Sequence, residues 1–128
     1  MPAYSDIVLD HFQNPRNLGE IENADAVAEV ENPVCGDRAR VSLRISNGRI
    51  AEARFLAEGC PAAIAASSMT TVLLTGMTVS EALALRDTDV AKALGGLPPN
   101  KVHCSVLAEE VIQAALVGYV PPVATAVP

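Results

Sequence analysis

ARVSLRISNGRIAEARFLAEGC, residues 39–60, carries the clearest local pattern in the chain. Apolar and polar residues alternate on both sides of Asn47-Gly48, as they do in two half-buried strands joined by a tight turn. We therefore expect an antiparallel hairpin with one face against a core. The apolar positions are Ala39, Val41, Leu43 and Ile45, then Ala51, Ala53, Phe55 and Ala57.

The length of the hairpin loop determines which face each apolar set occupies. A two-residue loop at Asn47-Gly48 would place Leu43 opposite Glu52 and put the two apolar sets on opposite faces. A three-residue loop, residues 46–48, places Leu43 opposite Ala51 and brings both sets to one face. We predict the three-residue loop.

The second strand leads directly into a helix. Pro61 is favoured at the first position of a helix, so Cys60 is the expected N-cap of a helix over residues 61–74. Residues 59–80 carry no charge and are long enough to span a bilayer. Their hydroxyl side chains gather mainly on one side and their apolar side chains on the other. We therefore predict a buried helix and no membrane association.

The remaining elements follow from periodicity and from turn residues. Residues 24–32 alternate as a strand, and residues 119–128, with three prolines and no charge, are expected to fray. Four further helices are expected: residues 4–12, residues 79–85, residues 90–94 after a cap at Thr88, and a long final helix with Asn100 as its N-cap.

Composition limits the functions open to the chain. Its 128 residues suffice for one domain, residues 1–128, with an ordinary hydrophobic core. The net charge of −6 argues against nucleic-acid binding, which needs a basic face. We find no export signal pattern, so we expect a cytoplasmic protein whose three cysteines form no disulfide framework. Metal ligation or a reactive thiol is the natural alternative, although single buried cysteines are common.

A second informative stretch, LPPNKVHCS at residues 97–105, places His103 and Cys104 in the first turn of the final helix. There the free N–H groups and the positive end of the helix dipole favour a thiolate. Adjacent side chains on a helix diverge by about 100°. We therefore expect that His103 and Cys104 cannot easily face one point together, and that fraying of the helix start presents either one.

Five residues form a candidate metal site: Cys35, Asp37, Cys60, His103 and Cys104. Thiols with one imidazole and one carboxylate suit zinc or an iron–sulfur cluster. Asp37 shares a loop with Cys35, so we expect its carboxylate to stay near water and to hold iron loosely. The spacing is not that of a zinc finger, and each residue could instead be an ordinary turn, cap or surface residue. The residues alone leave both interpretations open.

Three motifs occur in a fixed order along the chain. They are Cys35-Gly36-Asp37, Gly59-Cys60, and Leu97-Pro98-Pro99 followed by Lys101 and His103-Cys104-Ser105. Together with residues 4–19, they resemble the signature regions of the IscU family of iron–sulfur cluster assembly scaffolds, which includes the N-terminal domain of NifU. The resemblance extends over nearly the whole chain.

The resemblance implies a compact α+β fold, with a small antiparallel sheet of about three strands and helices packed on it. It implies a scaffold without turnover of its own, which assembles [2Fe–2S] clusters from iron and persulfide sulfur and transfers them to apo-proteins. The three cysteines would hold the cluster with Asp37 or His103 as fourth ligand. Cys104 would accept the persulfide sulfur, and zinc often occupies such a site in place of iron.

The same resemblance implies partners. They are a cysteine desulfurase, a ferredoxin-type electron donor, a frataxin-like protein, an Hsp70-type chaperone pair and apo-iron–sulfur proteins. Two departures from the family pattern bear on function. Pro61 stands where the family usually has Gly, which stiffens the loop beside Cys60. Asn100 stands where the chaperone motif, Leu97 to Lys101, usually has Val, and this puts recruitment of a dedicated chaperone in doubt.

Three other functions compete with a scaffold. A zinc-bound sulfur-relay protein would carry persulfide on Cys104 without assembling a cluster. A Cys–His hydrolase would need a base that meets its nucleophile, yet His103 is expected to face away from Cys104 and His11 is distant in sequence. A structural zinc module would lose its fold on chelation.

Overall fold

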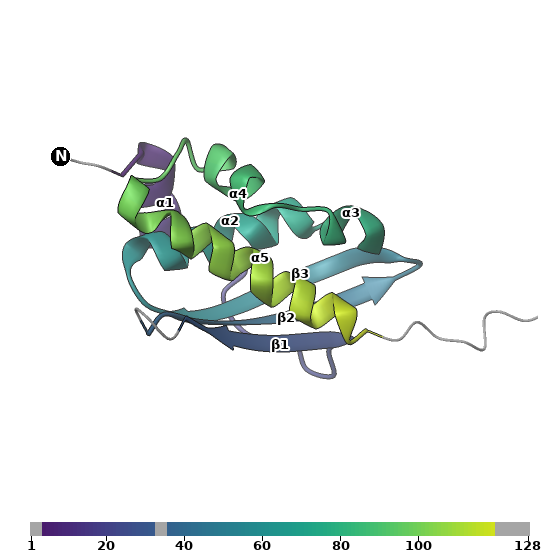
Figure 1. Ribbon diagram of the computed structural model, residues 1–128. Helices are drawn as coiled ribbons and strands as arrows, with labels where there is room; N and C mark the ends of the chain where they lie inside the picture. The colour runs from purple at the N-terminus through teal and green to yellow at the C-terminus, as the bar shows by residue number, and fades with distance from the viewer. Residues whose placement is uncertain (1–3, 33–35, 120–128) are drawn as a thin grey trace, which may run out of the picture.

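The computed structural model describes residues 4–32 and 36–119. A three-stranded antiparallel sheet in the order β1-β2-β3 has its helices packed on one face (Figure 1). The predicted α+β architecture is confirmed. The elements are α1 (Asp6–Gln13), β1 (Ala26–Glu31), β2 (Arg38–Ser46), β3 (Arg49–Glu58), α2 (Pro61–Leu74), α3 (Val79–Leu83), α4 (Asp87–Ala93), the 3₁₀ turn η1 (Pro99–Lys101) and α5 (Val102–Val117).

The turn of the β2–β3 hairpin is shorter than predicted. Ser46 pairs with Arg49, so only Asn47 and Gly48 form the loop. Both have positive φ, 54° and 76°, which is the conformation of a two-residue turn that matches the twist of the strands. The expected three-residue loop is therefore wrong.

A β-bulge, and not a longer loop, brings the two apolar sets to one face of the sheet. The register shifts at Arg44/Ile45, and beyond the shift Leu43 pairs with Ala53 instead of the predicted Ala51. Ala51 is exposed, whereas Leu43 and Ala53 are buried. One extra residue in a strand moves the following side chains to the other face, so the two apolar sets still meet. The predicted matching of faces is confirmed, and its predicted cause is wrong.

The core lies between the sheet and the layer formed by α2 and α5. α5 packs on β1 and β2, and α2 packs on β3 and α1. α2 begins at Pro61 with Cys60 as N-cap, as predicted, and ten of its fourteen residues are buried. Most of the ten are Ala, Ser and Thr, which let neighbouring elements approach closely. The uncharged stretch is thus a buried helix; among the described residues, no helix is long and apolar enough to cross a bilayer.

Three helix starts differ from the sequence predictions. α1 begins at Asp6, two residues after the predicted start. α4 begins at Asp87 with Arg86 as N-cap, one turn before the predicted start; the Asp89 carboxylate accepts a 3.0 Å hydrogen bond from the Arg86 N–H, and the Glu109 carboxylate of α5 accepts one from the Asp87 N–H at 2.5 Å. Asn100 is not the cap of α5. It lies in η1, closed by a 2.8 Å hydrogen bond from the Lys101 N–H to the Pro98 carbonyl, and Lys101 is the N-cap. Of the residues expected to fray, only Tyr119 is described.

Candidate metal and sulfur site

The candidate ligands come from three elements that meet at one end of the sheet. Asp37 immediately precedes β2, Cys60 caps α2, and His103 and Cys104 lie in the first turn of α5. The strand β3 runs straight into α2 at this end, and α5 begins beside it, at the left of Figure 1. Cys35 lies outside the described residues, so the structure leaves its predicted role untested.

Three side-chain atoms, two sulfurs and one nitrogen, converge on the carboxylate of Asp37. Its Oδ2 lies 3.9 Å from Cys60 Sγ, 3.8 Å from Cys104 Sγ and 3.9 Å from His103 Nε2. The two sulfur atoms are 3.6 Å apart. Ligand atoms at zinc distances stand about 3.3 to 3.8 Å apart in a regular tetrahedron. These four spacings are close to that range, and Asp37, His103 and Cys104 lie within 4.8 Å of one another, which makes them a set of three donors that could hold one metal ion.

His103 and Cys104 both face this point, contrary to the sequence prediction. One ligand atom each from Asp37, His103 and Cys104 lies within 4.8 Å of the others. The directions of the two Cα–Cβ bonds do diverge around the helix, but the imidazole is long and no preceding turn of α5 stands in its way. The carboxylate of Asp37 reaches both side chains because it lies beside the helix end.

The site is closed on one side and open on the other. Cys104 is 1% exposed and Asp37 6%, whereas the side chain of His103 is 37% exposed and Cys60 is half-buried. The expectation that Asp37 stays near water is wrong. The Asp37 carboxylate lies inward, against Gly59, where it accepts hydrogen bonds from the thiols of Cys60 and Cys104. Solvent reaches the site past His103, beside an open hollow of about 580 Å³ between β1 and α5.

Gly59 makes room for the Asp37 carboxylate. A Cβ atom at Gly59 would lie 2.7 Å from Cγ of Asp37, well inside van der Waals contact. Gly59 also has φ of 153°, which a residue with a side chain adopts only with strain. Asp37 packs directly against the backbone of Gly59, so this position needs a residue without a side chain. The sequence offers only one sign of it, a glycine directly before a helix cap.

The electrostatics of the metal-free site favour a protonated Cys104 thiol. Burial raises the pKa of the Cys104 thiol strongly, and the neighbouring Cys60 and Asp37 raise it further. The predicted thiolate at the helix N-terminus is therefore wrong for the metal-free protein, because desolvation outweighs the helix dipole here. Lys101 opposes this effect, and its electrostatic interaction with Cys60, and next with Tyr4, raises the pKa of the Lys101 ammonium in return.

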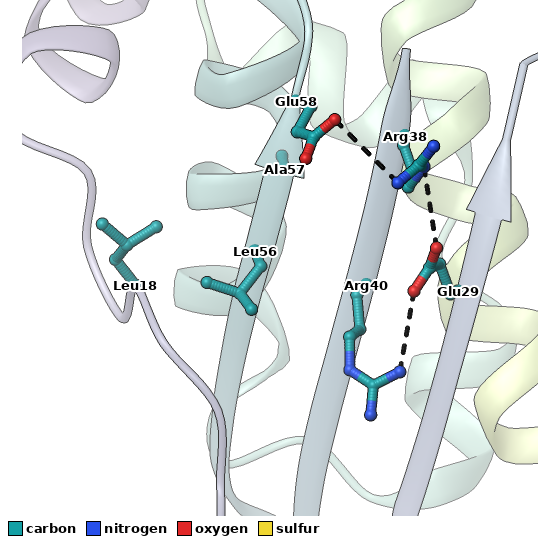
Figure 2. A pocket seen from close by; sticks show the side chains of 7 residues that line it. All are labelled: Leu18, Glu29, Arg38, Arg40, Leu56, Ala57 and Glu58. Carbon is teal, nitrogen blue, oxygen red and sulfur yellow. Dashed lines mark ion pairs between the residues drawn. The ribbon is translucent and has the colours of Figure 1, made fainter. Parts of the chain in front are cut away.

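A second hollow, of about 300 Å³, lies on the sheet face opposite the helices. In Figure 2 its charged side chains pair with one another: Arg38 with Glu29 at 3.6 Å and with Glu58 at 4.0 Å, and Arg40 with Glu29 at 3.6 Å. The seven residues that line it include no thiol or imidazole. We assign it no part in metal or sulfur chemistry.

Fold and site together define a class of protein: an α+β domain that gathers thiols, an imidazole and a carboxylate at one end of a three-stranded sheet. The NifU-like N-terminal domain family matches residues 3–125. This chain belongs to that family, and the resemblance found in its motifs is confirmed.

Named relatives agree with this assignment. The chain is 52% identical over 116 residues to the iron–sulfur cluster assembly scaffold protein IscU 1 of Archaeoglobus fulgidus, across 91% of this chain and 76% of that one. It is 44% identical over 121 residues to the IscU scaffold protein of Escherichia coli K12, across 91% and 94% of the two chains. A crystal structure of a nitrogen-fixing NifU-like protein (N-terminal) from Brucella abortus shares the fold, with TM-score 0.73, 20% identity and coverage of 88% and 91%.

Proposed function

We propose that this protein is a scaffold on which [2Fe–2S] clusters are assembled from iron and persulfide sulfur and then transferred to apo-proteins. The observation that carries the proposal is the convergence of Cys60, His103 and Cys104 on Asp37, with ligand spacings of 3.6–3.9 Å. Family membership and the scaffold names of the relatives support it. The cluster is cargo, so the protein needs no turnover of its own.

The donor set explains how such cargo is both held and released. Two thiols bind iron firmly, and the carboxylate and imidazole are harder or weaker ligands that an incoming thiol can displace. Asp37 is buried whereas His103 borders solvent, so we assign the first exchange with an acceptor to His103. Cys35, as the third cysteine of the family motif, completes the ligand set in this proposal.

Cys104 is the proposed acceptor of persulfide sulfur. The role comes from its match to the His-Cys-Ser motif of the family. Because Cys104 is 1% exposed, a sulfur donor reaches it only when the first turn of α5 moves or through the Cys60 side of the site.

The partners in the proposal follow from this chemistry. A cysteine desulfurase supplies the sulfur, a ferredoxin-type donor supplies electrons, a frataxin-like protein takes part in assembly, and apo-iron–sulfur proteins receive the product. The Hsp70-type chaperone is the least supported of these partners. Asn100, which is exposed in η1, stands where the chaperone motif usually has Val. Cytoplasmic location belongs to the same proposal.

Zinc binding is the competing proposal, because the same donors could hold a single metal ion. A zinc-bound sulfur-relay protein would carry persulfide but build no cluster. Anaerobic reconstitution with ferrous iron and sulfide separates the two functions. A scaffold develops the visible absorption of a [2Fe–2S] cluster, and a Cys60→Ser variant loses it. Iron that binds without any sulfide-dependent absorption would favour the relay.

A further inference from the structure

The distance between the two described thiols suggests a step that precedes cluster assembly. Cys60 Sγ lies 3.6 Å from Cys104 Sγ, which is van der Waals contact between sulfur atoms. The two residues come from different elements, the cap of α2 and the first turn of α5, so the folded chain holds the contact. Any sulfur placed on Cys104 is therefore formed within reach of a second thiol.

We propose that Cys60 is a resolving thiol, which attacks the persulfide on Cys104 and releases its outer sulfur as sulfide inside the site. The inference rests on the proposed role of Cys104 as persulfide acceptor. The released sulfide would combine with iron at this site once the bond between the two thiols, formed in the same step, has been reduced.

The step balances in atoms, protons and electrons. The Cys60 thiol gives its proton to the Asp37 carboxylate, and its sulfur attacks Sγ of Cys104. A Cys60–Cys104 disulfide forms while the S–S bond of the persulfide breaks, and the electron pair of that bond leaves with the outer sulfur as hydrosulfide. The proton follows from Asp37 to the hydrosulfide. The two thiol sulfurs are oxidised together by two electrons, and the sulfane sulfur is reduced by two.

Asp37 is placed for the proton transfer. Its Oδ2 accepts from both thiols, at 3.9 Å from Cys60 Sγ and 3.8 Å from Cys104 Sγ. Attack on the outer sulfur would only move the persulfide from one thiol to the other. The inner sulfur is Sγ of Cys104, which lies 3.6 Å from Cys60 Sγ. The contact therefore favours attack on the inner sulfur.

A reductant must then reopen the disulfide. Two electrons are needed for each sulfide, and a dithiol or a one-electron carrier acting twice can supply them. This assigns the external reductant a defined target, the Cys60–Cys104 bond. It also makes the first sulfide independent of that reductant, which an experiment can detect.

The test uses the full-length, metal-free protein, reduced and desalted under anaerobic conditions. A limiting amount of inorganic polysulfide serves as sulfur donor, with no other thiol present. Free sulfide is measured over time, and the chain is alkylated and weighed. Each polysulfide ion leaves one sulfide once its sulfane sulfur has been taken up. Beyond that amount we expect about one further sulfide per chain, a chain about 2 Da lighter, and a linked peptide that joins Cys60 to Cys104.

The Cys60→Ser variant keeps a hydrogen-bonding group at this position and removes the nucleophile. It should gain about 32 Da on Cys104 and retain that mass, with release of the further sulfide, beyond that left by the polysulfide itself, at least tenfold slower. Equal release by the variant, or a wild-type chain that keeps its persulfide beside a free Cys60 thiol, overturns the inference and leaves Cys104 as acceptor. A disulfide that maps to Cys35 also overturns it.

Failure of the proposed function looks different. If wild type gains neither the extra mass nor a disulfide, Cys104 is no acceptor, and the resolving role falls with it. If the variant fails to fold, the mass and peptide map of the wild-type chain decide the matter alone.

Discussion

Replacing Gly59 with Ala should separate the position of Asp37 from the stability of the fold. The new Cβ would lie 2.7 Å from Cγ of Asp37, about 1 Å inside the usual contact distance of 3.5–4.0 Å. The carboxylate must then move by about that distance, whereas metal ligation tolerates about 0.2 Å. We expect zinc affinity to fall by roughly 10- to 100-fold, the range found when groups that orient a metal ligand are lost.

Backbone strain accompanies this change and needs its own control. A side chain at the φ of 153° of Gly59 costs about 1–3 kcal/mol in the free energy of unfolding. Gly76→Ala is the matched control, since Gly76 also has positive φ, 94°, with no atom within 4 Å of its Cβ position. That variant should lose similar stability and keep the zinc affinity of wild type.

The assays are urea denaturation of the metal-free chain and a zinc titration against a chromophoric chelator. A double variant, Gly59→Ala with Asp37→Ala, should be less destabilised than the sum of the two single variants, because removal of the carboxylate relieves the clash. Zinc affinity of Gly59→Ala equal to that of Gly76→Ala, together with additive effects in the double variant, would refute this reasoning.

Three further predictions concern the core, the pH dependence and the release of the cluster. Leu43→Ala should lower the free energy of unfolding by about 2–5 kcal/mol in urea denaturation, since Leu43 is fully buried; a loss below about 1 kcal/mol would contradict its place in the core. Burial, and next the charge of Arg16, lower the pKa of His11, while Asp10 raises it. The unfolded chain therefore binds the proton first, and stability falls as the pH drops below about 6.5; a His11→Gln variant that keeps the same slope would assign it to another group. Because the first exchange is assigned to His103, His103→Ala should slow transfer of an assembled cluster to apo-ferredoxin more than Asp37→Ala does, whereas a larger effect of Asp37→Ala would show that the buried carboxylate leaves first.

The hairpin shows how far alternation can predict a sheet. Alternation located both strands, and the rule that apolar faces must match excluded a simple two-residue turn. It did not distinguish a longer loop from a bulge, because both restore the match. The side chain that decides between them, exposed Ala51, is small enough to be accepted on either face.

The helix starts show a second limit of local patterns. Pro61 predicted the start of α2 correctly, because a proline at the first helical position is a purely local preference. The start of α4 has both a local partner, Asp89, which accepts from the Arg86 N–H, and a distant one, Glu109 of α5, 22 residues away, which no local pattern shows. Asn100 has the chemistry of a cap, but the preceding prolines favour a 3₁₀ turn at that place.

The sequence indicates which residues come together at the site better than it indicates their geometry. Residue chemistry and motif order named Asp37, Cys60, His103 and Cys104, all of which the structure brings together. The burial of Asp37 and the raised pKa of Cys104 depend on tertiary packing. Neither property follows from positions along the chain. The helix dipole acts locally, whereas desolvation of a side chain depends on residues that are distant in sequence.

The most direct test of the scaffold proposal is the iron and acid-labile sulfide content of protein purified anaerobically and reconstituted with ferrous iron and sulfide. The account predicts equal amounts of iron and labile sulfide, up to two of each per chain, both lost on transfer to an apo-protein. Zinc that is retained throughout, with no labile sulfide under any condition, would contradict it.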